Sequence, residues 1–70
     1  MKNNSFGRRL KELRLEHNIS QRKLGQILGV VNQTISFWEL GTREPDLDTL
    51  VLIANYFNVT LDYLVGSNNF

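Results

Sequence analysis

Apolar residues recur three and four positions apart along almost the whole chain, which is the spacing of one helix face rather than the alternation of a strand. The pattern predicts five short helices, over residues 5–16, 21–28, 32–40, 47–57 and 61–64. The side chains expected inside are Phe6, Leu10, Leu13, Leu24, Ile27, Leu28, Ile35, Trp38, Leu47, Leu50, Val51, Ala54 and Phe57. No segment alternates convincingly between apolar and polar residues, so the predicted fold class is all-α.

Residues that favour helix ends flank these segments. Polar side chains able to cap a helix stand before three of them, namely Ser20, Asp46 and Thr60. Gly29 and Gly41 follow the second and third segments, where a left-handed residue commonly ends a helix. The third segment departs from this pattern at its start, because Val31 has no oxygen to accept an N–H bond. About 1 kcal/mol of capping energy is therefore expected to be missing there.

The composition limits the protein to a single small domain, residues 1–70. The chain has no cysteine and one histidine, His17, which argues against disulfides and against a metal site. The sequence contains no apolar run long enough to span a membrane and no recognisable signal peptide. Ser20 and Ser36 have no plausible base partner, and Asp46 and Asp48 are better explained by helix capping and first-turn charge, so no enzyme is predicted. No cofactor is expected.

Charge is unevenly distributed although the net charge is only +1. All eight basic residues lie within residues 1–43 against three acidic ones, a balance of +5. Residues 44–70 hold four acidic residues and no lysine or arginine. If the fold keeps the two parts on separate faces, the molecule presents one electropositive end, which favours a polyanionic partner.

The segment of residues 21–40 has the pattern of a helix-turn-helix. Gly25 lies between core leucines of the first helix, where the absence of a side chain lets the second helix approach closely. Gly29 permits the sharp turn, and Val30 fills it. Ile35 and Trp38 then anchor the second helix. Each feature is common alone, but the ordered set within one window is specific.

On these residues the chain resembles the phage-repressor (Cro/C1, or XRE) family of helix-turn-helix DNA-binding domains. The strongest segments are ISQRKLGQILGV, TISFWELGTREPDLDTL and NVTLDYLVG, and the resemblance covers about residues 6–66, with the helix-turn-helix at about 21–40. It implies a compact, five-helix, lambda-repressor-like domain whose third helix enters the major groove. It also implies a homodimer on operator DNA, and surplus apolar residues in the last two helices (Val51, Ile53, Phe57, Tyr63 and Val65) are consistent with such an interface.

The resemblance assigns separate roles to residues of the helix-turn-helix. It places base-reading side chains at Asn32, Gln33, Ser36 and Phe37. It places phosphate contacts at Gln21, Arg22, Thr42 and Arg43. It gives Gln21 the second role of steadying the third helix. It pairs Arg14 with Glu39 as a structural ion pair, the alternative being two solvated surface charges.

Phe37 departs from the family pattern, which more often has a polar residue at this position. Because it lies about 200° around the helix from Ile35, it faces outward if Ile35 is buried. Three interpretations are open. The ring contacts thymine methyl groups, or it docks a partner protein, or it folds back on the rim of the core or sits exposed.

Two functions from different classes follow. The first is a sequence-specific, double-stranded-DNA-binding transcriptional regulator, with repression preferred over activation, in the cytoplasm of a bacterium or encoded by a phage. The alternative is a protein-interaction module, such as an antitoxin or an antirepressor-bound component. The chain is either a small whole protein or the N-terminal part of a longer regulator. The operator, the effector, the regulated genes and the oligomeric state in solution are not determined by the sequence.

Overall fold

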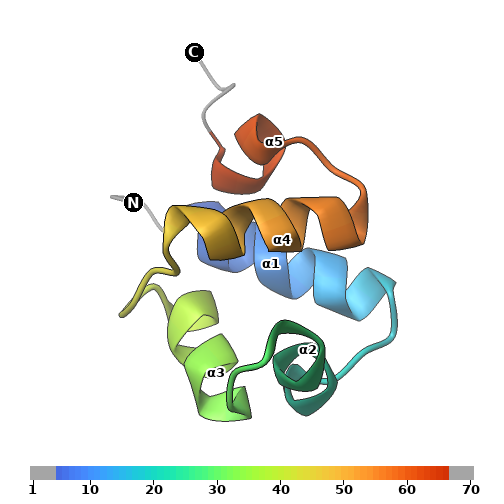
Figure 1. Cartoon of the computed structure of the whole chain (residues 1–70), viewed down its shortest axis with the longest axis vertical. Coiled ribbons are helices and arrows are strands. Elements are labelled where there is room, and N and C mark those ends of the chain that lie inside the picture. The colour runs from blue at the N-terminus through green and yellow to red at the C-terminus, as the bar shows by residue number, and fades with distance from the viewer. Residues whose placement is uncertain (1–4, 67–70) are drawn as a thin grey trace.

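A computed structural model of the chain describes residues 5–66, and this part of the chain is built from helices joined by short turns, without strands (Figure 1). The helices are α1 (Ser5–Glu16), α2 (Gln21–Leu28), α3 (Asn32–Leu40), α4 (Leu47–Phe57) and α5 (Leu61–Val65). All five predicted helices and the all-α fold class are confirmed. The last helix extends one residue further than the apolar spacing predicts.

The helix-turn-helix pair forms one end of the molecule. Figure 1 shows α2 and α3 at one end of the longest axis and α5 at the other, with α1 and α4 crossing between them. The described chain measures about 33 × 24 × 21 Å. One end of the protein is therefore made of α2, α3 and the loops that flank them.

A single core joins the five helices. Five large side chains are fully buried, one from each helix: Leu10, Leu24, Ile35, Ile53 and Leu64. Burying each aliphatic side chain of this size contributes about 1.5–3 kcal/mol. Because every helix donates a residue to the same cluster, α3 is held by the whole domain and not only by its neighbour α2.

Three residues predicted to be buried are instead exposed. Leu47 is 64 % exposed, Val51 42 % and Ile27 37 %. The prediction failed for Leu47 and Val51 because α4 is apolar on two sides, so its spacing does not tell which stripe faces inward. Packing against the rest of the bundle buries the stripe made of Leu50, Ile53, Ala54 and Phe57, so Ile53 takes the place expected for Leu47 and Val51. Ile53 and Phe57, both named as candidates for a dimer surface, therefore belong to the core of one chain, which for Phe57 confirms the burial that was also predicted.

The predicted caps are present. The side-chain oxygens of Ser20, Asp46 and Thr60 each accept a backbone N–H three residues on, at 2.9, 2.9 and 3.0 Å. Hydrogen bonds from the side chain and the backbone N–H of Thr49 lower the pKa of Asp46, so this capping carboxylate stays charged to a lower pH than an ordinary aspartate does. Local sequence thus specifies where three of the helices begin.

The start of α3 lacks such a cap, and restoring one is expected to stabilise the protein. Val31 already has the extended N-cap backbone, φ −75° and ψ 156°, and its side chain makes no capping bond. Because Val31 is 66 % exposed, exchanging it removes little buried surface. Val31→Ser is expected to raise the free energy of unfolding by about 1 kcal/mol. Urea denaturation checks this, with Val31→Ala as the matched control, and a serine variant no more stable than the alanine variant contradicts it.

Candidate nucleic-acid interface

The side of α3 that faces away from the core carries the predicted base-reading residues. Ile35 and Trp38 are buried on the inner side. At about 100° per residue, the four predicted positions lie within about 140° of the opposite circumference. They are Asn32 and Gln33, both exposed, and Ser36 and Phe37, both partly buried. The structure therefore brings all four to one outward surface.

The turn between α2 and α3 is tight. A Cβ atom on Gly25 would lie 2.6 Å from the Val30 carbonyl oxygen, closer than real Cβ contacts allow. The Val30 N–H donates to the Gly25 carbonyl oxygen at 2.9 Å. Gly29 has φ +77°, in the left-handed region that favours glycine. The absence of a side chain at Gly25 therefore sets how closely α2 and α3 approach.

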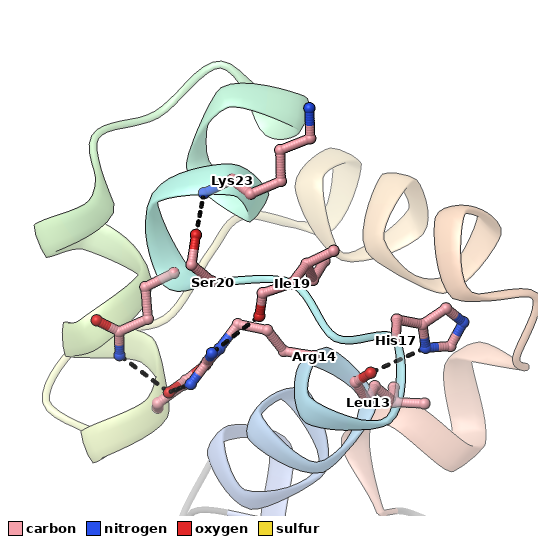
Figure 2. A network of polar contacts seen from close by, with 8 residues as sticks. Leu13, Arg14, His17, Ile19, Ser20 and Lys23 are labelled. Carbon is pink, nitrogen blue, oxygen red and sulfur yellow. Dashed lines mark hydrogen bonds and ion pairs between the residues drawn. The ribbon is translucent and has the colours of Figure 1, made fainter.

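A buried polar network holds α3 against the other helices (Figure 2). Arg14 Nε and Nη2 donate to the two carboxylate oxygens of Glu39 at 2.7 and 3.2 Å. Arg14 Nη1 donates to the Ile19 carbonyl oxygen at 3.0 Å, so one guanidinium joins α1, the following loop and the end of α3. The two side chains are only 10 % and 6 % exposed. The expected structural pair is present, and the alternative of two solvated charges does not apply.

Gln21 belongs to the same network. Its Nε2 donates to Glu39 Oε1 at 3.1 Å, which fixes the start of α2 relative to the end of α3. The sequence interpretation gave this residue a phosphate contact and a role in steadying α3. The second role has a bond to support it, and the amide retains a second N–H for an acceptor outside the protein.

The segment after α3 folds back onto the helix. The backbone N–H and the hydroxyl of Thr42 both donate to the Phe37 carbonyl oxygen, at 3.0 and 3.3 Å. The Arg43 guanidinium carbon lies 4.9 Å from the centre of the Phe37 ring. Sequence reasoning assigned Phe37 and Arg43 to separate tasks, and the structure places them in contact. The sequence did contain a signal for this contact, because Gly41, which ends the helix, stands between Phe37 and Arg43.

Basic residues do not gather at a single end as the charge pattern suggested. Arg22, Lys23 and Arg43 are exposed on α2 and after α3. Arg14, by contrast, is engaged with Glu39. Arg9 stacks over the ring of Tyr63, on the α5 side of the molecule, at 4.5 Å. The expected electropositive end is thus made by fewer cations than the sequence balance implied, because α1 spans the molecule.

Leu40 is a surface feature that the sequence interpretation missed. It was treated only as the end of the third helix, yet it is 67 % exposed. It lies one turn beyond Ser36 and therefore on the same outward side of α3. Helical spacing alone contained this signal. The outward surface is therefore polar at its start and apolar at its end.

His17 has structural partners within the domain. His17 Nδ1 lies 2.9 Å from the Leu13 carbonyl oxygen, and the ring packs edge-on against Phe57. Within residues 5–66 no group of three His, Cys, Asp or Glu side chains is placed to hold a metal ion. In the same range no helix has the length and apolar character needed to cross a membrane.

Comparison with known proteins gives concordant matches. A family model described as helix-turn-helix matches residues 10–64. The HTH-type transcriptional regulator ImmR of Bacillus subtilis (strain 168) is 39 % identical over 64 residues, covering 91 % of this chain and 50 % of ImmR. The chain spans about half the length of the curated relatives it matches, 50 % of ImmR and 56 % of the uncharacterized HTH-type transcriptional regulator YqaE of the same organism.

The chain is also similar to a solved structure and to a relative with lower sequence identity. The P22 c2 repressor protein, crystallised in complex with synthetic operator 9T, superposes with a TM-score of 0.79 at 34 % identity, covering 84 % of this chain and 89 % of that one. Antitoxin PezA of Streptococcus pneumoniae serotype 4 (strain ATCC BAA-334 / TIGR4) is 29 % identical over 63 residues, 90 % of this chain and 40 % of PezA.

Proposed function

We propose the following function on the premise that this chain belongs to the helix-turn-helix family, whose model matches residues 10–64. The protein binds double-stranded operator DNA sequence-specifically and regulates transcription. The main support for this function is the outward surface of α3, which the Arg14–Glu39–Gln21 network holds in one orientation. The similarity to a repressor crystallised on its operator supports the same function. Repression by occluding a promoter is the preferred mode of action.

In this mechanism α3 enters the major groove. The amides of Asn32 and Gln33, at the start of the helix, pair with the N6 and N7 edge of adenine. Gln21, Arg22, Thr42 and Arg43 contact phosphates on either side of the groove and set the register of the helix. The two groups of residues have different roles because phosphates carry no sequence information, whereas base edges do. A cytoplasmic location in a bacterium belongs to this proposal.

Selection from a randomised duplex pool, followed by titration of the selected site at several salt concentrations, tests the function directly. We expect a palindromic site bound at least ~10³-fold more tightly than random duplex. We also expect the logarithm of the affinity to fall linearly with the logarithm of the salt concentration, because phosphate contacts release counterions. Absence of enrichment over random DNA would refute the proposal.

Substitutions at two exposed residues are expected to impair DNA binding in different ways. Gln33→Ala is expected to cost about 1–3 kcal/mol on the selected site and to relax preference at one base position. Arg22→Gln is expected to weaken binding to all duplexes alike and to reduce the salt slope by about 1. Both positions are exposed, so neither change should disturb the fold. Fluorescence anisotropy with selected and scrambled duplexes separates the effects, and identical behaviour of the two variants contradicts the assigned roles.

Assembly as a homodimer on DNA is part of the proposal. The exposed side of α4 carries Leu47, Val51, Leu52 and Tyr56. An apolar stripe of this kind supports self-association through α4, which would place two copies of α3 on half-sites about 34 Å apart. Analytical ultracentrifugation with and without the selected duplex tests it. One chain per palindromic duplex at saturation would refute the dimer.

A protein-interaction module is the second candidate function. It is favoured by the similarity to an antitoxin and by the exposed apolar side chains of Val31 and Leu40 at the two ends of α3. Its partner would be a toxin or an antirepressor. The salt dependence separates the candidates, since an apolar protein contact need not weaken steeply with salt whereas phosphate binding must.

A further inference from the structure

Phe37 has a defined partner on the outward side of α3. Its ring is partly buried, and the guanidinium of Arg43 lies over it, with the Arg43 Cζ atom 4.9 Å from the ring centroid. This distance is within the range of a cation–π interaction. One face of the ring is therefore occupied by a cation from the same chain.

The end of α3 specifies this contact. Gly41 adopts φ +83°, and its N–H donates to the Trp38 carbonyl oxygen at 3.2 Å. The Thr42 N–H donates to the Phe37 carbonyl oxygen at 3.0 Å, which completes a Schellman turn. The chain reverses at this turn and returns over the residue one turn back. The turn thus brings Arg43 back beside Phe37.

Stacking leaves the hydrogen-bonding capacity of Arg43 free. A guanidinium has five N–H donors in its plane, and an aromatic ring contacts only its face. Arg14 is a contrast within the same protein, since its donors are directed at Glu39 and Ile19. Arg43 is also exposed. Its guanidinium is therefore restrained in position yet able to donate two parallel hydrogen bonds to an anionic group with two acceptor oxygens, such as phosphate.

We propose that Phe37 is a positioning residue, which holds the Arg43 guanidinium at the end of α3 to bind a DNA phosphate. The proposal rests on the proposed DNA-binding function. It selects among the interpretations of Phe37, because the ring then acts through Arg43 and not by contacting a thymine methyl group. The stacked pair sets a fixed offset between the base-reading side chains of α3 and one backbone contact.

Salt dependence distinguishes this role from direct base contact. Phe37→Leu removes no charge, so a ring that merely contacts bases or fills space would leave the salt slope unchanged. If the ring holds Arg43 on a phosphate, Phe37→Leu makes the salt slope less steep, toward that of Arg43→Gln. The magnitude of the slope then falls by an amount approaching ~0.9. It then weakens binding to operator and random duplex by a similar factor, about tenfold for Arg43→Gln. Phe37→Tyr, which keeps the ring, retains the wild-type slope.

A double-variant comparison and a DNA-free measurement complete the test. In the Arg43→Gln background, Phe37→Leu is expected to cause no further loss of affinity, because its effect runs through the arginine. In the free protein, NMR should show the Arg43 side-chain protons shifted upfield by the Phe37 ring. That shift should persist in Phe37→Tyr and vanish in Phe37→Leu. The wild-type measurement requires no variant, so it holds even if Phe37→Leu does not fold.

The possible results distinguish failure of the positioning role of Phe37 from failure of the proposed DNA-binding function. An unchanged salt slope in folded Phe37→Leu, together with a lowered slope in Arg43→Gln, overturns the positioning role and leaves the DNA-binding function standing. Additive losses in the double variant, or no ring-current shift in the wild-type protein, also overturn it. If the wild-type protein binds no duplex at all, the proposed function itself fails, whatever the NMR shows.

Discussion

Replacing Arg14 with methionine is expected to lower the free energy of unfolding by about 3 kcal/mol. The substitution leaves the Glu39 carboxylate in a site where its side chain is 6 % exposed, without the cation that compensates it. Breaking one partner of a buried pair costs this much because the remaining charge is desolvated and unmatched. A domain of this size has only about 5–10 kcal/mol of stability, so the loss is a large part of the total. Urea denaturation followed by circular dichroism measures it.

The control is the removal of both charges. Arg14→Met combined with Glu39→Leu leaves no buried charge, so the double variant is expected to be more stable than the sum of the single losses predicts. Lys11→Met provides a matched control on the exposed side of α1 and should change stability by less than about 0.5 kcal/mol. Additive single losses, or an Arg14 variant as stable as the Lys11 variant, would contradict the inferred role of the pair.

Gly25→Ala is expected to have the second-largest effect, a net loss of about 2 kcal/mol. Alanine improves helix propensity by about 1 kcal/mol, which works in the opposite direction. The added Cβ, however, would lie 2.6 Å from the Val30 carbonyl oxygen and 3.3 Å from the Val31 carbonyl carbon. These are backbone atoms that cannot rotate aside, so the turn itself must shift. Thermal denaturation should show a fall of roughly 8–16 °C in Tm.

The neighbouring position supplies the comparison for Gly25. Gln26 is exposed on the same helix, so Gln26→Ala changes propensity without adding a contact and should alter stability by less than about 0.5 kcal/mol. Because Gly25 sets the distance between α2 and α3, its alanine variant should also bind the selected duplex more weakly than Gln26→Ala does. Equal stability of the two variants would show that the turn tolerates a side chain.

Helix positions and their ends were predictable because they depend on neighbours in the chain. The side-chain oxygen of Ser20 accepts a hydrogen bond from an N–H three residues away, and the side-chain oxygens of Asp46 and Thr60 follow the same rule. The missing cap at Val31 was equally predictable, since valine has no acceptor. Such features need only local dihedral angles and local chemistry.

Burial along α4 was predicted less well. Leu50 and Leu47 are both leucines three positions apart, yet only Leu50 is inside. A helix that is apolar on two sides offers two solutions to the periodicity, and its neighbours in space select one. The same limit applies to Phe37, which spacing alone places on the outward side without revealing the cation that covers it.

The sequence by itself determined the five helices, the tight turn at Gly25 and Gly29, and the outward side of α3, because each follows from residues within one or two helical turns. It also determined the family, because the segments that carry the resemblance lie along about residues 6–66. The tertiary structure decided which stripe of α4 is buried, that Gln21 bonds Glu39, and where the basic residues lie. The partners in these contacts are far apart in the chain: Arg14 and Glu39 are separated by 25 positions and Gln21 and Glu39 by 18. Contacts over such separations exist only once helices pack, because loop closure and core burial must bring the partners together first.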